Sequence, residues 1–306
     1  MRLYIFVYTI INLVCIPLIA ENNIEPKNYR ELVQLFEDWR DFENPPLMNG
    51  APDYTKRRFD GAQKEFNALQ NRLEKVDTTN WPIYYQVDWW IVHAEMNGYD
   101  FNHRVLRPWV RDPAFYQTIW MYQSDVPAHE GPTNHGVLEF WMFDFPLNNQ
   151  RTKDLADQLE TIPSFLFQAK GNLTGNARDL WVAGIENFKE QAENLQVIKE
   201  KVKKHHGNSL DGLLSTPLKT AKEANNDFIK WLEQKAPTKN GPSGIGKANY
   251  TWYQKNVHLV PLSWEEEVSL LQRELDRSWS SLKMQEHLNR NLPPMISAKT
   301  EQEFDI

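Results

Sequence analysis

The residues best suited to bind a metal ion are histidines with a carboxylate nearby. His129-Glu130 and His135 lie in the segment HEGPTNH. Zinc peptidases place two histidines four residues apart on a helix, with a glutamate beside the first as general base. Here the spacing is longer, and Gly131-Pro132 between the histidines is incompatible with a helix. We therefore interpret this segment as a surface loop without a zinc site.

Two other groups of histidines are candidates for the same chemistry. His93 and Glu95 share a predicted helix with His103, but ten residues of helix separate the histidines by about 15 Å, too far to share one ion. His205 and His206 end the basic stretch KVKKHH, where positive charge complements the helix dipole. A role at the end of a helix is favoured there. No residue of this chain is predicted to ligate a metal, bind a cofactor or act in catalysis.

The sequence contains no motif for nucleophilic catalysis or for phosphate binding. Cys15 is the sole cysteine and lies in a predicted leader, so a cysteine nucleophile is excluded from the mature chain. No Gly-x-Ser-x-Gly elbow is present. Gly244-Ile-Gly246-Lys247 lacks the full glycine spacing and the preceding strand of a phosphate loop. We interpret it as a structural turn.

Residues 1–20, MRLYIFVYTIINLVCIPLIA, predict a secretory signal peptide. Arg2 begins an apolar run that ends at the small Ala20, before the polar Glu21-Asn22-Asn23. We expect cleavage after Ala20 and export to the periplasm or the extracellular space; an uncleaved membrane anchor is the alternative. No later apolar run approaches the length of a transmembrane helix, so no membrane contact is expected after cleavage.

The composition is that of a globular protein. The chain has 306 residues, of which 41% are hydrophobic and 25% charged, with a formal net charge of −7. An acidic balance argues against general nucleic-acid binding, which needs a basic face. The 12 tryptophans are interpreted mainly as core residues, because most stand at helical spacing among other apolar residues; a stacking surface for sugars or bases is the alternative.

Apolar residues recur at helical spacing through most of residues 21–306, which predicts one all-α, multi-helix domain of long amphipathic helices. Residues 137–147 fit a helix or a strand. In the third helix, the apolar face is expected to hold Ile83, Val87, Trp90, Ile91 and Ala94. The expected helices are about 28–43, 55–76, 82–104, 114–123, 150–170, 175–204 and 212–235.

The most distinctive stretch is 241–284. It begins with a Gly/Pro/Ser turn and enters a long helix after Pro261. Ser263 and Glu266 have the spacing of a capping box. One face of this helix is apolar and the other is charged. The apolar face consists of Trp264, Val268, Leu271, Leu275 and Trp279.

Several segments, in this order along residues 28–300, carry a likeness to a known family. They are Asn71–Asp77, Leu106–Pro113 with Tyr116, Glu160–Leu166 with Ala169–Leu173, and Trp231–Glu233 with Gly244–Gly246 and Tyr250. Together they resemble the N-terminal portion of the domain of unknown function 885 family, whose members are mostly exported bacterial proteins. That family is similar to helical zinc metallopeptidases, and its His-Glu-x-x-Pro-Gly-His motif lies downstream of the region matched here.

The resemblance implies that this chain is the non-catalytic N-terminal half of a metallopeptidase-like exported protein. Zinc and a peptide substrate are then expected only in a full-length member, and the chain alone is expected to be inactive. The helix-like segment Lys299–Glu303 favours truncation, and Gly241–Met284 is interpreted as the hinge toward the missing half. The alternative is a stand-alone periplasmic helical module for binding or interaction.

Overall fold

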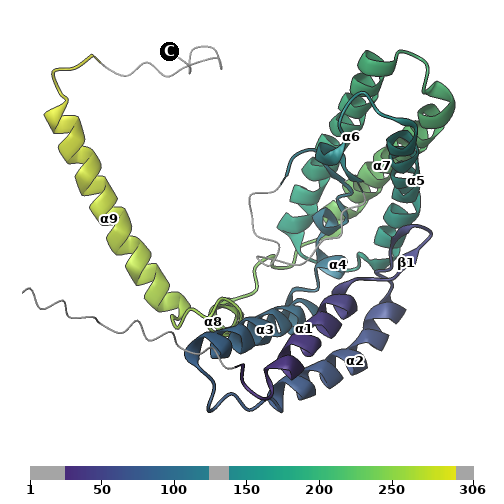
Figure 1. Cartoon of the computed structure of the whole chain (residues 1–306). Coiled ribbons are helices and arrows are strands. Elements are labelled where there is room, and N and C mark those ends of the chain that lie inside the picture. The colour runs from purple at the N-terminus through teal and green to yellow at the C-terminus, as the bar shows by residue number, and fades with distance from the viewer. Residues whose placement is uncertain (1–24, 124–137, 294–306) are drawn as a thin grey trace, which may run out of the picture.

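The structure, a computed structural model, describes residues 25–123 and 138–293 and is built almost entirely of helices (Figure 1). The all-α, multi-helix prediction is confirmed. The predicted signal peptide, the HEGPTNH loop and the segment Lys299–Glu303 lie outside the described residues. Two three-helix units follow one another along the chain. The first contains α1 (Tyr29–Glu43), α2 (Lys56–Glu74) and α3 (Ile83–Phe101); the second contains α5 (Asn149–Asn172), α6 (Arg178–His206) and α7 (Asp211–Lys235).

The first unit is held together by aromatic packing. Trp39 of α1 is fully buried, with its ring centre 5.5 Å from that of Phe42, 5.9 Å from Phe66 of α2 and 5.2 Å from Tyr99 of α3. Such rings bury large apolar areas, so a few of them suffice to hold three helices. Thr55 caps α2 by accepting a hydrogen bond from the Arg58 backbone nitrogen.

The predicted apolar face of α3 was wrong in part. Only Ala94 of its five members is buried, whereas Ile83, Val87, Trp90 and Ile91 are 47–73% exposed. The helix carries apolar residues on all sides, so periodicity alone cannot select the buried face. The side that packs on α1 and α2 carries Val92 and Met96, with Tyr85, Trp89 and Tyr99 partly buried.

An irregular connection follows α3. It consists of the π-helix η1 (Asn102–Leu106), the short helix α4 (Pro108–Arg111) and the 3-10 turn η2 (Pro113–Tyr116). The predicted helix 114–123 is therefore only this turn, followed by β3 (Ile119–Trp120). The ambiguous residues 137–147 form β4 (Leu138–Glu139), which pairs in parallel with β3, and then η3 (Phe140–Met142). A small hairpin, β1 (Leu47–Met48) and β2 (Ala51–Pro52), joins α1 to α2.

The second unit has an aromatic and aliphatic core with one buried polar connection. Phe188 of α6 and Phe228 of α7 are fully buried, with ring centres 4.6 Å apart. Gln191 donates to Asn225 at 2.9 Å and accepts from the Thr118 backbone nitrogen at 2.8 Å. Because these buried amides are paired, they fix α7 and the β3 segment against α6. The neighbouring Thr118 hydroxyl is buried and has no partner among the described residues.

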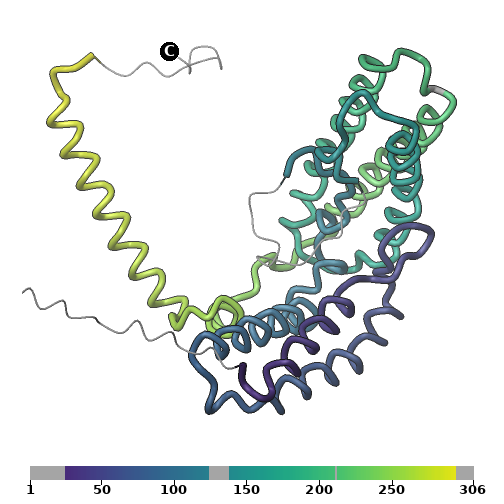
Figure 2. The backbone as a smooth tube through the Cα atoms, in the orientation of Figure 1, coloured from purple at the N-terminus to yellow at the C-terminus, as the bar shows by residue number. Residues whose placement is uncertain are grey.

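The chain then passes through η4 (Ala236–Thr238) to α8 (Lys247–Asn256) and α9 (Trp264–Leu288). Gly246 precedes α8 with a φ of +80°, a backbone conformation that favours glycine, in keeping with the turn predicted there. The capping box is confirmed, since the Ser263 hydroxyl accepts from the Glu266 nitrogen and the Glu266 carboxylate accepts from the Ser263 nitrogen. Figures 1 and 2 show α9 extending away from both units, and none of its residues is buried.

Candidate functional site

A pocket of about 410 Å³ lies in the first unit, between α1, α2, α3, the connection through α4, and α8. Its lining combines charged side chains with aromatic rings. The sequence predicts no site residue, and this pocket has no signature in it, because the lining residues come from five separated segments of the chain. The charged members are Arg40, Glu43, Asp53, Arg58 and Glu95.

Three of the charged groups form a compact cluster. The Arg40 guanidinium lies 2.7 Å from a carboxylate oxygen of Glu43 and 2.9 Å from one of Glu95. The two carboxylates are 19% and 14% exposed, so their attraction to Arg40 is less screened than that of a surface ion pair. Arg40 is thereby occupied by protein carboxylates.

Arg58 is in a different position. It is half-buried on α2, with its guanidinium carbon 5.7 Å from the centre of the Phe42 ring. Within residues 25–123 and 138–293, no carboxylate forms an ion pair with Arg58. Its charge acts on the neighbouring Tyr99, whose pKa is raised mainly by burial while Arg58 opposes that rise. The pocket therefore contains a cation that the described protein does not neutralise by direct contact.

His103 and Asn102 belong to the π-helix that forms one side of the pocket. The His103 Nδ1 atom lies 2.9 Å from the Tyr99 carbonyl oxygen. A carbonyl only accepts, so Nδ1 carries the proton and Nε2 is an acceptor. Burial lowers the pKa of His103, which favours this neutral form. Among the described residues, neither His103 Nε2 nor Asn102 Oδ1 has a hydrogen-bond partner, although both atoms are buried.

The same connection contains an unusual backbone conformation. Arg107, directly after the π-helix, has φ 45° and ψ 54°, in the left-handed region that non-glycine residues seldom adopt. This reversal begins α4 at Pro108 and places Trp109 against the pocket. Pi-helical turns and left-handed non-glycine residues are frequent at functional sites, where the surrounding structure holds them.

Aromatic rings form the apolar side of the pocket. Phe59 of α2 and Trp109 are stacked, with ring centres 3.9 Å apart and an angle of 19° between the planes. Tyr54 lies 4.9 Å from Phe115 and continues this surface. We call Phe59 and Trp109 the aromatic wall. Tyr54 lies parallel to Phe59 at 6.1 Å and His103 lies 4.7 Å from Trp109, so the wall belongs to a packed aromatic cluster that lines the pocket.

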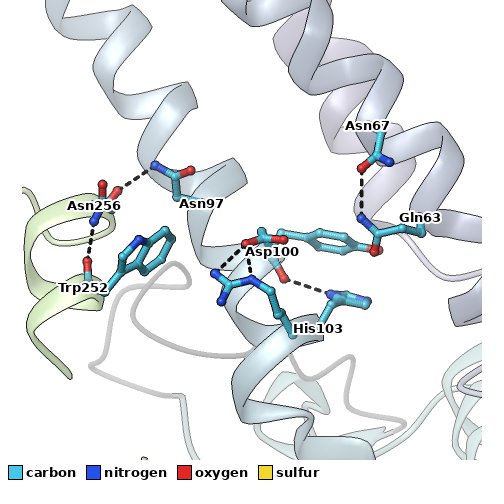
Figure 3. A network of polar contacts seen from close by, with 9 residues as sticks. Gln63, Asn67, Asn97, Asp100, His103, Trp252 and Asn256 are labelled. Atoms are coloured by element: carbon cyan, nitrogen blue, oxygen red, sulfur yellow. Dashed lines mark hydrogen bonds and ion pairs between the residues drawn. The ribbon is translucent and has the colours of Figure 1, made fainter. Parts of the chain in front are cut away.

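Helix α8 closes the pocket by packing on α3. The Asn97 side chain donates to the Asn256 carbonyl oxygen at 3.1 Å, as Figure 3 shows. Phe101 stacks on Trp252 with ring centres 5.5 Å apart. At Gly98, a Cβ atom would lie 3.3 Å from Cγ1 of Val257, so glycine permits this close approach. Val257 and the nearby Tyr253 line the pocket.

The structure separates the histidines that the sequence analysis considered. Glu95 binds Arg40 and lines the pocket with His103, whereas His93 stacks on Trp89 at 4.9 Å. His206 is the last residue of α6, and its Nε2 accepts from the Leu147 backbone nitrogen at 2.8 Å, so it anchors the preceding loop. In the part of the chain that the structure describes, no group of three or more His, Cys, Asp and Glu side chains is placed to hold a metal ion.

A second candidate surface is the apolar side of α9. Leu271 is 67% exposed, Leu275 50% and Trp279 54%. We call Val268, Leu271, Leu275, Trp279 and Leu282 the α9 face. Long apolar surfaces of this kind usually mark a site of contact with another polypeptide or a ligand. No helix in the described ranges is both long enough and apolar enough to span a bilayer.

Comparison with known proteins identifies the fold only. No family model matches the chain, and no curated protein matches it. One solved structure, from Shewanella oneidensis and described provisionally as a lipoprotein of unknown function, is similar over 90% of this chain with a TM-score of 0.56 and 15% sequence identity. The match covers 48% of that structure, so this chain spans about half of its length. This supports a shared helical architecture, and the resemblance to the domain of unknown function 885 family stays a prediction.

Proposed function

We propose that this chain is the non-catalytic N-terminal half of an exported, metallopeptidase-like helical protein, and that the α9 face is the surface on which the other half packs. The observation that carries the proposal is α9 itself. It is a well-capped helix of 25 residues with a regular apolar face, and none of its residues is buried. A helix with this pattern normally packs its apolar side against another element.

Two further observations support the same proposal. The similar solved structure is about twice as long as this chain, which leaves room for a second half in a protein of this architecture. The sequence segments that resemble the metallopeptidase-like family also belong to its N-terminal portion. In a complete protein, the first unit would form one wall of a substrate cleft, and the other half would contribute zinc and its ligands.

The coding sequence beyond Ile306 tests the proposal. We expect a continuation, in frame or restored by a single frameshift, that contains His-Glu-x-x-Pro-Gly-His. A stop codon followed by an unrelated gene would contradict it. Zinc-dependent peptidase activity of the purified chain would contradict the non-catalytic assignment as well, because no ligand set for zinc is predicted in it.

The second candidate function is a stand-alone helical module that binds a ligand in the periplasm. The pocket of the first unit favours this candidate, since it is formed by residues of this chain alone. Behaviour in solution separates the two functions. A severed half that exposes the α9 face should associate or aggregate as its concentration rises, whereas a complete module should remain monomeric and stable.

A further inference from the structure

We propose that the pocket of the first unit binds a small carboxylate that bears a ring, with the carboxylate on Arg58 and the ring on the aromatic wall. The assignment goes beyond the proposed function, because it depends only on residues of this chain and holds whether or not a second half follows. It rests on the charge of Arg58, which no carboxylate of the described residues pairs, on the apolar side of the pocket and on the backbone around it.

Most of the charged groups that line the pocket already have partners. Glu43 and Glu95 both contact Arg40, and Asp53 accepts a hydrogen bond from the Thr55 backbone nitrogen at 2.9 Å. The one lining cation without a carboxylate contact among the described residues is Arg58. A planar guanidinium binds a carboxylate through two parallel hydrogen bonds, so Arg58 favours an acid over an amine as ligand.

Tyr99 supplies a second donor near Arg58. Its ring lines the pocket, and its hydroxyl has no hydrogen-bond partner in the described part of the chain. Because burial raises the pKa of Tyr99, the hydroxyl stays protonated at neutral pH and can donate to an anion. A ligand carboxylate is disfavoured at Arg40, because the carboxylates of Glu43 and Glu95 that contact Arg40 would repel it. Arg58 is therefore the favoured position for the ligand carboxylate.

The apolar side of the pocket selects for a ring. Phe59 and Trp109 both line the pocket, and a ligand ring can make offset or edge contact with such an aromatic cluster. A volume of about 410 Å³ lies at the small end of the range for ligand pockets, which fits a single-ring acid better than a long chain. The π-helix beside this wall contains two buried polar atoms without a partner among the described residues, His103 Nε2 and Asn102 Oδ1. The residue that follows it, Arg107, has a left-handed backbone conformation. Such energetically unfavourable features are typical of a binding site.

Isothermal titration calorimetry of the purified protein tests the proposal with 3-phenylpropionate and its uncharged amide. The two compounds share the ring, but only the acid carries the negative charge that Arg58 would bind. We expect the acid to bind at least about 10-fold more tightly than the amide. Equal affinities for the two compounds, or no binding of the acid at millimolar concentration, would overturn the proposal.

The variant pair Arg58→Gln and Arg57→Gln locates the binding site. Arg57 is the exposed neighbour on the same helix, so it controls for a general loss of positive charge. We expect Arg58→Gln to weaken binding of the acid at least about 10-fold and to leave the amide unchanged, with Arg57→Gln behaving like the wild type. Equal loss in both variants would overturn the assignment of Arg58. If a thermal melt shows that Arg58→Gln is unfolded, the Arg58→Lys variant and the acid–amide comparison on the wild type still test the proposal.

A further arm distinguishes a free acid from the C-terminus of a peptide. Glycyl-phenylalanine carries the same carboxylate and ring as part of a peptide, and its C-terminal amide is the control. The proposal requires that 3-phenylpropionate binds in preference to its amide. Once that holds, the tighter of the two acids identifies the source as a free acid or as a peptide C-terminus. Neither result depends on the sequence beyond Ile306, so this test and that of the proposed function fail independently.

Discussion

Helices α7 and α9 are both 25 residues long, and both have an apolar face, yet their surroundings are opposite. In α7, Ala221, Phe228 and Leu232 are fully buried against the neighbouring helices. In α9, Leu271 and Trp279 are more than half exposed. A periodic apolar pattern thus predicts a helix and its apolar face, but it does not predict which element of the molecule covers that face.

The two helices are therefore stabilised in different ways. Packing against α5 and α6 holds α7, with Asn225 paired to Gln191 inside the core. The first turn of α9 contacts α8, where the Tyr250 hydroxyl donates to Glu267 and the Thr251 hydroxyl accepts from the Trp264 nitrogen. The rest of α9 depends on local features, namely its capping box, its acidic first turn and the ion pair between Lys283 and Glu286. Local features of this size make an isolated helix only marginally stable.

The largest expected effect comes from truncating one aromatic residue in each helix. Phe228→Ala should lower the free energy of unfolding by about 3–5 kcal/mol, because it opens a cavity beside Phe188. Trp279→Ala should change it by less than about 0.5 kcal/mol, since half of that side chain is already in water. Urea unfolding followed by circular dichroism measures both. Similar losses in the two variants would mean that α9 packs as α7 does.

Breaking the polar connection to α7 should have a smaller effect. Gln191→Leu leaves Asn225 and the Thr118 backbone nitrogen without their partner inside the core, which we expect to cost about 2 kcal/mol in urea unfolding. Gln150→Leu, at an exposed position, is the matched control and should cost less than about 0.5 kcal/mol. If the control costs as much, the buried pairing is not what fixes α7.

Removal of the cap should act on α9 alone. Ser263→Ala deletes the acceptor for the Glu266 nitrogen and should cost the helix about 1 kcal/mol. We expect faster amide hydrogen exchange in the first turns of α9 and no change in α7. A fall in the stability of the whole molecule would instead show that α9 is coupled to the two units.

The smallest effect is expected from the pH dependence of the first unit. Burial holds the pKa of His103 below its usual value, so in acid the unfolded chain binds a proton that the folded chain does not. Stability should then fall as the pH drops below about 6.5, and it should be recovered as the pH rises again. His103→Phe should flatten this part of the curve measured by urea unfolding. An unchanged curve would assign the dependence to other groups, of which His93 is one, because burial also lowers its pKa.

The sequence predicts the long helices well, because strong periodicity and clear caps act locally. The capping box at Ser263 and Glu266 and the turn at Gly246 are examples. It fails where the outcome depends on tertiary contacts. Ile83 and Trp90 are expected on the packed face of α3, yet both are exposed. Because this helix has apolar residues on all sides, its pattern does not determine which side is buried.

The pocket could not be predicted for a related reason. Arg40 and Glu95 meet across two helices, and the π-helix with left-handed Arg107 has no marker that periodicity would detect. The sequence holds part of the signal, because His103 and Glu95 are candidate functional residues on one predicted helix. The structure brings them to a pocket together with residues of α1, α2 and α8.

Amide hydrogen exchange of α9, measured in this chain and in a longer polypeptide that includes any continuation beyond Ile306, tests the central claim most directly. The account predicts rapid exchange in the middle of α9 in this chain, around Leu271 and Leu275, while α7 is strongly protected. In the longer polypeptide, α9 should become protected to a similar degree as α7. Strong protection of α9 in the monomeric chain alone, or rapid exchange in both forms, would contradict the claim that the α9 face is a packing surface for a second half.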